Sequence, residues 1–205
     1  FVDGVPVLRA EIVDFWELVF NPSAVHRLLH VLIGALILGG FFIMSIAAYY
    51  LLKRRHEAFA RRSFRGALIV GTIGAFAALI RGHFQARNVY RHQPAKLAAF
   101  EALYETPEGG APMVLFGLPD DDEQRVRLSV ELPGMLSFLV HDNFKEPVIG
   151  LDKFRPEDRP PVAVPFHSYH MMIMIGMFFI ALTTLSWICL KRGNFFEKRW
   201  LLWIY

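Results

Sequence analysis

Two long runs without a charged residue constrain this chain more than any other feature. Val31 to Leu52 and Pro165 to Leu190 contain no Asp, Glu, Lys or Arg. Each run exceeds the roughly 20 residues that an α-helix needs to cross the ~30 Å hydrocarbon layer of a bilayer. Because 54% of all residues are hydrophobic, we expect an integral membrane protein. The formal net charge of +3 is small, and we do not expect nucleic acid as a partner.

Basic residues between the apolar segments predict their orientation. They follow the first run and the last run, and are Lys53, Arg54, Arg55, Arg61, Arg62 and Arg65, then Lys191, Arg192, Lys198 and Arg199. The positive-inside rule places both clusters in the cytoplasm. The 15-residue uncharged run Gly66 to Ile80 must then also cross the membrane, with Arg65 and Arg81 extending it by snorkelling.

These patterns predict an all-α integral membrane fold. It is a transmembrane helix bundle with three complete spans, the start of a fourth span at Trp200, and a large periplasmic loop. The expected segments are 1–22, interfacial and amphipathic; 23–85, a transmembrane helix pair with a basic cytoplasmic turn; 86–164, the loop; and 165–205, a transmembrane helix and the start of the next.

Local patterns predict further elements. Apolar residues recur at helical spacing over 8–20, which is typical of a helix lying at the membrane surface. Gly34, Gly39 and Gly40 would let a neighbouring helix or a flat cofactor approach the first span closely. Alternation over 128–132 predicts a short strand within the loop. The chain begins at Phe without a preceding Met and stops inside an apolar run, so we expect it to be part of a longer protein.

One histidine and one methionine are candidate ligands of a heme iron. His30 lies 23 residues before Lys53 and Met172 lies 19 residues before Lys191, which is about 34 Å and about 28 Å along a helix. Both side chains therefore reach a similar depth near the outer face. An imidazole and a thioether on neighbouring helices would suit a six-coordinate, low-spin heme b. The alternative is that both side chains only pack. Competing ligands are nearby at His26, His170, Met171 and Met174.

The beginning of the loop carries a second candidate site. Pro94 predicts the start of a short helix with Leu97 on its apolar face. Lys96 and Glu101 are five residues apart and point about 140° away from each other on a helix. One interpretation is two solvated charges on a surface helix. The other is a site at which Lys96 binds a substrate oxygen and Glu101 accepts a proton.

At this point the sequence resembles subunit I of the cytochrome bd family of quinol oxidases. The resemblance is carried by blocks in family order through nearly the whole chain. They are Asn21-Pro22 leading to His30, Phe59 to Phe64, Gln93 to Glu101, Leu115 to Asp120, Pro147 to Leu151, His170-Met171-Met172 and Glu197 to Leu202.

The resemblance implies a heme-containing membrane oxidase that takes electrons from ubiquinol or menaquinol and reduces dioxygen to water. It places His30 and Met172 at the axial ligands of the low-spin heme b. It also places Lys96 and Glu101 in the loop that oxidises quinol. The implied partners are subunit II, membrane lipid and the missing remainder of subunit I, which would carry the high-spin heme b and heme d. The implied location is the bacterial cytoplasmic membrane.

Two departures from the family pattern stand out. His170 occupies a position that is often arginine in the family, which removes a permanent charge and offers a rival ligand. The loop also lacks the long insertion that some members carry after Leu151. Because the helices for the oxygen site are absent, this piece alone is not expected to reduce oxygen.

Two other classes of function remain open from the residues. A heme-free membrane scaffold or transporter segment would use His30 and Met172 only for packing. A b-type electron-transfer cytochrome would keep the heme without oxygen chemistry.

Overall fold

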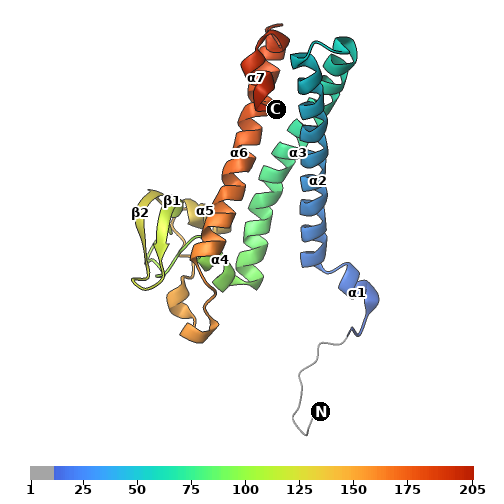
Figure 1. Cartoon of the computed structure of the whole chain (residues 1–205). Helices are drawn as coiled ribbons and strands as arrows, with labels where there is room; N and C mark the ends of the chain where they lie inside the picture. The colour runs from blue at the N-terminus through green and yellow to red at the C-terminus, as the bar shows by residue number, and fades with distance from the viewer. Residues whose placement is uncertain (1–11) are drawn as a thin grey trace.

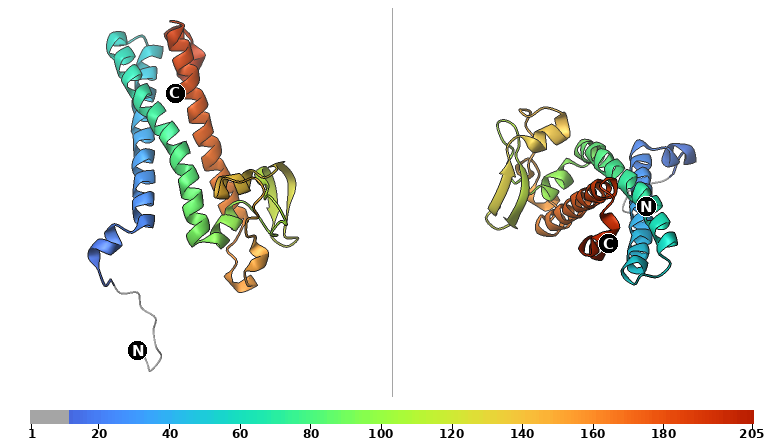
Figure 2. Two further views of the ribbon diagram at one scale, coloured as in Figure 1. Left: turned by 180° about the vertical axis from the view of Figure 1, so that it is seen from behind. Right: turned by 90° about the horizontal axis from the view of Figure 1, so that it is seen from above.

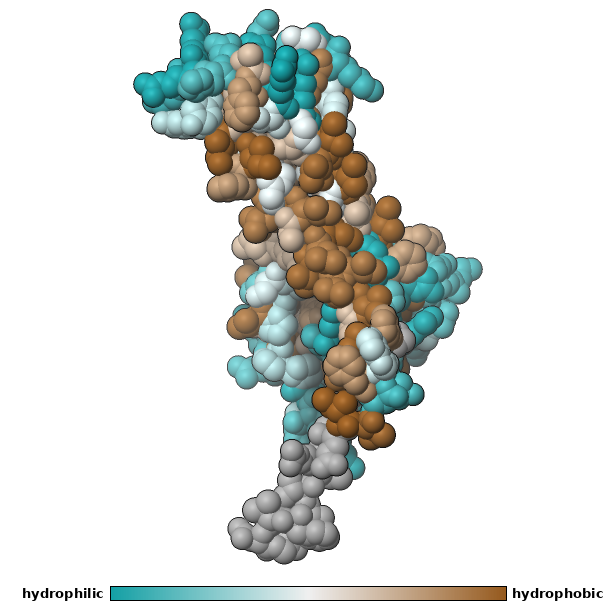
Figure 3. Space-filling model, turned by 90° about the vertical axis from the view of Figure 1, so that its right-hand side faces the viewer, coloured by the Kyte–Doolittle hydropathy of each residue, from teal (hydrophilic) through white to brown (hydrophobic). Residues whose placement is uncertain are grey.

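The computed structural model describes residues 12–205, and three long helices dominate it (Figure 1). They are α2 (Pro22–Leu52), α3 (Glu57–His92) and α6 (Ala163–Lys191). Each is long and apolar enough to cross a bilayer, and the face of the molecule drawn in Figure 3 shows a band of apolar side chains between more hydrophilic regions. The three complete spans expected from the sequence are therefore present, and the described chain is a mostly helical membrane protein.

The second span is much longer than its uncharged core. α3 has 36 residues, which is about 54 Å at 1.5 Å per residue. This length exceeds the hydrocarbon layer, so the last turns of α3 extend beyond it on the side of the loop. The residues from Arg81 to His92 consequently line the region where the membrane helices meet the loop.

Glycines allow α2 and α3 to pack closely. A Cβ atom added to Gly40 would lie 2.9 Å from the backbone nitrogen of Gly71, and one added to Gly74 would lie 2.9 Å from the side chain of Ile37. Contacts this short are possible only without side chains. Gly40 thus has the role that the sequence predicted. No helix packs on Gly34 or Gly39, because nothing lies within 4 Å of a Cβ atom at either position, and the approach of a flat cofactor there stays a prediction.

An apolar core joins the three spans at the end remote from the loop. The fully buried Phe64 contacts Phe195, with ring centroids 4.8 Å apart. η3 (Phe195–Glu197) leads into α7 (Arg199–Ile204), the predicted start of a fourth span. The hydroxyl groups of Tyr205 and Ser186 are 2.7 Å apart, so this last segment is held against α6.

The loop folds into a compact unit against the ends of α3 and α6 (Figure 2). Its elements in order are α4 (Pro94–Phe100), β1 (Met113–Asp120), β2 (Arg125–Leu132), α5 (Met135–His141), η1 (Leu151–Lys153) and η2 (Pro156–Asp158). β1 and β2 form an antiparallel hairpin. The strand predicted over 128–132 is the second half of β2. Its partner β1 was not predicted, and this hairpin departs from the all-α expectation.

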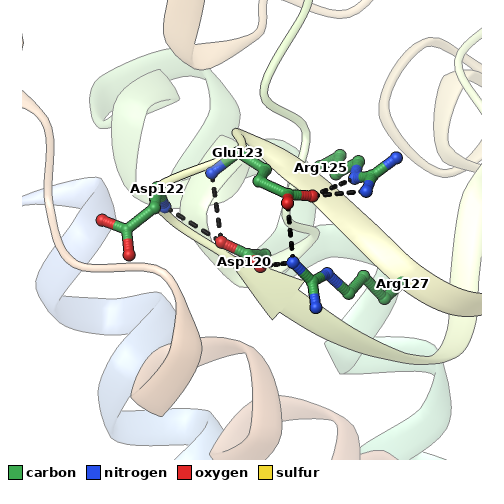
Figure 4. A network of polar contacts seen from close by, with 5 residues as sticks. All are labelled: Asp120, Asp122, Glu123, Arg125 and Arg127. Carbon is green, nitrogen blue, oxygen red and sulfur yellow. Dashed lines mark hydrogen bonds and ion pairs between the residues drawn. The ribbon is translucent and has the colours of Figure 1, made fainter.

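A polar network closes the turn of the hairpin (Figure 4). The carboxylate of Asp120 accepts hydrogen bonds from the backbone nitrogens of Asp122 and Glu123, both at 3.1 Å. The bond from Glu123 is the main cause that lowers the pKa of Asp120. Arg127 adds ion pairs to Asp120 at 2.7 Å and to Glu123 at 2.8 Å. Because these ion pairs are exposed, they contribute little stability, and the backbone hydrogen bonds define the turn.

A short helix precedes the first span. α1 (Phe15–Val19) begins at Asp14, whose carboxylate accepts hydrogen bonds from the backbone nitrogens of Trp16 and Glu17. It is shorter than the helix predicted over 8–20, and residues 8–11 lie outside the described part of the chain. Its rings are largely exposed, as in Phe15 and Trp16, which suits a position at a membrane surface.

Candidate quinol and heme sites

Glu101 is a buried carboxyl group at the end of α4. Its side chain is 2% exposed. No group meets strict hydrogen-bond geometry with its oxygens among the described residues, and the hydroxyl group of Tyr169 is the one side chain that acts on it. Such a group is costly unless it binds a proton or a ligand. The interpretation of Lys96 and Glu101 as two solvated charges is therefore wrong for Glu101.

Burial determines the ionisation of this carboxyl group. The loss of solvation raises the pKa of Glu101 to about 7, and the hydroxyl group of Tyr169 opposes that rise. An acid with a pKa near the working pH can both take up and release a proton. Glu101 therefore has the property required of a proton acceptor near neutral pH.

Two stacked rings connect Lys96 with Glu101. The ammonium group of Lys96 lies 5.7 Å from the ring centroid of Phe100, and this ring lies 5.0 Å from that of Tyr169 on α6. Lys96 is exposed, whereas Glu101 is enclosed. Contacts therefore run from the exposed cation through the Phe100–Tyr169 pair to the buried acid, on which the Tyr169 hydroxyl group acts.

The backbone after Glu101 is held in place by the far end of the loop. The carbonyl oxygens of Leu103 and Tyr104 accept hydrogen bonds from Leu151 and Asp152, at 2.9 and 3.0 Å. Gly150 packs directly on this segment, because an added Cβ atom would lie 2.6 Å from the carbonyl carbon of Glu105. The block Pro147 to Leu151 therefore supports the position of Glu101.

Two of the rival heme ligands are already engaged. Nδ1 of His170 lies 2.9 Å from the carbonyl oxygen of Phe166, and Nε2 lies 2.6 Å from that of Val114 in β1. Both nitrogens of this ring therefore contact the backbone. Nδ1 of His26 accepts a hydrogen bond from Arg81 at 2.6 Å. Through its contact with Val114, His170 joins α6 to the hairpin, and it is not free to bind iron.

His30 has the free imidazole that an axial ligand requires. Its Nδ1 is buried and has no hydrogen-bond partner in the described part of the chain. Met172 is 52% exposed on α6, so its sulfur is not committed to a protein core. An imidazole and a thioether are a suitable donor pair for a low-spin heme iron, and no cluster of three or more His, Cys, Asp or Glu side chains occurs among the described residues.

A glycine follows each of these two ligands by one helical turn. Gly34 follows His30 and Gly176 follows Met172 by four residues, so each glycine shares a face with its ligand. Nothing lies within 4 Å of a Cβ atom built at either glycine. Each candidate ligand thus lies next to a backbone position with open space beside it, which would suit a flat macrocycle.

The depths of the two ligands can be compared through one contact between their helices. Phe41 on α2 and Phe179 on α6 have ring centroids 4.1 Å apart. His30 precedes the first by 11 residues and Met172 precedes the second by 7, which is about 16 and about 10 Å. Both ligands lie on the loop side of this contact, at depths that differ by only about 6 Å.

The family of the chain follows from comparison with known proteins. The family model described as "Cytochrome bd terminal oxidase subunit I" matches residues 2–205. The chain belongs to the cytochrome bd terminal oxidase subunit I family. It is 32% identical to the cytochrome bd ubiquinol oxidase subunit 1 of Bacillus subtilis, over 95% of this chain and 43% of that protein. It is 34% identical to the cytochrome bd-II ubiquinol oxidase subunit 1 of Escherichia coli, over 76% of this chain and 30% of that protein.

A solved structure supports the same fold. The bd oxidase from Geobacillus thermodenitrificans matches with a TM-score of 0.85 and 28% identity, covering 93% of this chain and 44% of that one. The cytochrome bd chain described here therefore spans less than half the length of these relatives. Its membrane helices and its bacterial relatives indicate a protein of the cytoplasmic membrane, in a family of heme-containing oxidoreductases.

Sequence reasoning missed two participants of the sites. Tyr169 lies 68 residues from Glu101, and no local spacing connects them. Gly176 could have been found from the sequence, because it follows Met172 by one helical turn. The open space beside it, which only the structure shows, distinguishes it from a glycine that contacts a neighbouring helix.

Proposed function

We propose that this chain is the quinol-oxidising part of a terminal quinol:oxygen oxidoreductase of the aerobic respiratory chain, with the site of the low-spin heme b. The observation that carries the proposal is the buried carboxyl group of Glu101, which has the Tyr169 hydroxyl as its sole polar neighbour among the described side chains and lies five residues from the exposed Lys96. Family membership, together with the His30–Gly34 and Met172–Gly176 pairs, supports the heme site.

The residues of the loop perform the proton chemistry. Oxidation of a quinol to a quinone releases two protons and two electrons. Lys96 binds the quinol oxygen and stabilises the anion that forms when its proton leaves. Glu101 accepts the two protons in succession, passing the first to the outer solvent before it takes the second, and the Phe100–Tyr169 pair keeps the acid out of bulk water. The substrate is ubiquinol or menaquinol.

His30 and Met172 hold the heme iron from opposite helices. When bound there, a low-spin heme b would supply the one-electron redox chemistry that quinol oxidation requires. Because Glu101 takes the proton and the heme site takes the electron, the two leave the same substrate by different routes. The remainder of the subunit carries the high-spin heme b and heme d, and subunit II and membrane lipid complete the enzyme.

The orientation of the chain makes this separation useful. The segment 86–164 is the periplasmic quinol loop, and the basic turn within 23–85 is cytoplasmic. The segment 1–22 lies at the interface, and 165–205 returns to the cytoplasmic side before the next span. Protons from the quinol are then released outside the cytoplasmic membrane.

The decisive test of the loop replaces Glu101 by Gln in the complete enzyme. We expect quinol oxidation to fall by about 100-fold or more, because a positioned general base contributes roughly that factor, with the heme spectrum unchanged. Glu108→Gln, at an exposed position of the same loop, is the matched control. Unchanged turnover in Glu101→Gln would remove this residue from the mechanism. Quinol oxidation without oxygen reduction in the complete subunit would favour an electron-transfer cytochrome.

The heme site is tested by a reduced-minus-oxidised absorbance spectrum. We expect the low-spin heme b signal of the parent to be lost or converted to high spin in both His30→Ala and Met172→Leu. Survival of the signal in Met172→Leu would point to Met171 or Met174. A parent without any heme absorbance would identify a heme-free scaffold.

A further inference from the structure

A pocket lies apart from Glu101, between the loop-side ends of α2 and α3. Its volume is about 380 Å³, and it is lined by His26, Phe84, Arg87, Asn88, Arg91 and His92. No acidic side chain is part of this lining. The pocket is therefore suited to an anion, and the proposed quinol and heme chemistry does not use it.

The lining residues of α3 form one stripe with a change of polarity along it. Phe84, Arg87, Asn88 and Arg91 follow a spacing of three, four and seven residues, which places them on one face of the helix. Phe84 is 46% exposed and lies nearest to the apolar span, where Leu79 and Ile80 are also exposed. Along this face an apolar ring is followed by a guanidinium group, an amide and a second guanidinium group.

The positive charge of the pocket is only partly neutralised. Asp142 forms an ion pair with Arg87 at 2.5 Å and also contacts His83 at 3.2 Å. Arg91 has no ion pair among the described residues. Arg81, which donates to His26 at the rim, has a buried Nε atom without a partner. Arg91 thus brings to the pocket a positive charge without a carboxylate of its own, and Arg81 adds a second such charge beside His26.

The position of the pocket relative to the membrane indicates which kind of anion it binds. Arg81 follows directly after the apolar part of the span, so the pocket lies where the helices leave the hydrocarbon layer. This is the level of lipid phosphates, at which arginine side chains bind anionic headgroups. A ring on the membrane side and cations on the loop side match the acyl chain and the phosphate of one phospholipid. We propose that this pocket binds the phosphate of an anionic phospholipid.

The test uses the complete oxidase complex that contains this chain, in nanodiscs of uncharged phosphatidylcholine. Binding of short-chain phosphatidylglycerol is measured by native mass spectrometry for the parent, Arg91→Gln and Arg27→Gln. Arg27 is exposed at the same end of α2 but does not line the pocket, so it controls for charge alone. We expect binding about fivefold weaker in Arg91→Gln, the usual effect of one basic side chain near lipid phosphates, and unchanged binding in Arg27→Gln.

The outcomes distinguish the sources of phosphate. Equal weakening in both variants, or equal binding of short-chain phosphatidylcholine to the parent, would overturn the proposal. If inorganic phosphate alone bound the parent as tightly as the lipid and displaced it, the site would belong to a soluble anion and the lipid assignment would be wrong. An unchanged heme spectrum in both variants shows that the fold is intact.

Discussion

At the scale of single residues, the ionisation of Glu101 is the property on which the proposed chemistry depends. Burial raises its pKa from 4.5 to about 7, so the folded loop binds this proton more tightly than the unfolded chain does. The stabilisation is complete below pH 4.5 and is lost as the pH rises through 7, a change of roughly 3 kcal/mol. The free energy of unfolding of the loop is therefore lower at neutral pH than at acidic pH, and this is the cost of a buried acid that can exchange a proton near pH 7.

The pH dependence of quinol oxidation follows from the same pKa. Glu101 can accept a proton only when it is ionised, so we expect the rate to rise with pH through a limb near pH 7. The hydroxyl group of Tyr169 lowers the pKa of Glu101, and Tyr169→Phe removes only that hydroxyl group while keeping the stacked ring. The limb should move to higher pH in this variant. The measurement is kcat/KM against pH, with turnover at high pH showing that the site is intact.

The infrared band of the protonated carboxyl group provides an independent readout of the same pKa. A band that titrates at higher pH in Tyr169→Phe, and that is absent from Glu101→Gln, would confirm the assignment. A limb at the same pH in Tyr169→Phe and the parent would show that this hydroxyl group does not influence the acid.

At the scale of elements, the glycines of the spanning helices have two different uses. Gly40, Gly71 and Gly74 are covered by the neighbouring helix, which brings α2 and α3 into contact. Gly34 and Gly176 have nothing within 4 Å, yet each lies on the face of a proposed heme ligand. The same residue type thus serves helix packing in one half of α2 and an open ligand face in the other.

A side chain at an open glycine distinguishes these two uses. We expect Gly34→Leu in the complete subunit to reduce low-spin heme b occupancy, since overfilling a packed site costs about 1–3 kcal/mol, or roughly tenfold in heme affinity. Gly39→Leu is the matched control, because Gly39 lies about half a turn away from the face of His30 and also has nothing within 4 Å. The heme content per complex is measured by absorbance. Equal heme content in the two variants would mean that the macrocycle does not lie against Gly34.

At the scale of the whole molecule, the loop and the basic turn lie at opposite ends of the three spans (Figure 1). Such an arrangement requires the two ends to face different compartments. The basic residues near the turn outnumber those near the loop end, which favours a cytoplasmic turn. Arg81, Arg87 and Arg91 at the loop end are the exception, and the proposed lipid phosphate offsets part of their charge.

Labelling of single cysteines measures this orientation. With native cysteines replaced, including Cys189→Ala, we expect Asp122→Cys in the hairpin turn to react with a membrane-impermeant maleimide in intact cells. Arg55→Cys in the basic turn should react only after permeabilisation. Both positions are exposed, so access to the compartment decides the result. The reverse pattern of labelling would place the loop in the cytoplasm.

The sequence by itself determined the membrane class, the three spans and the position of Pro94 at the start of α4. Charge-free runs of this length have one stable solution in a bilayer, because every backbone polar group must be bonded within its own helix. Local periodicity also identified half of the hairpin. These features depend on interactions within a segment, and such interactions can be read from neighbouring residues.

Only the tertiary structure decided which polar groups are buried and which are already bonded. The burial of Glu101 depends on α6 and on the block at Leu151, which are distant along the chain. The engagement of His170 by Val114 required the hairpin to pack against α6. The pocket at Arg91 required two helix ends to meet. Solvation and hydrogen bonding of these groups are set by contacts between distant segments, and spacing along the chain contains no record of them.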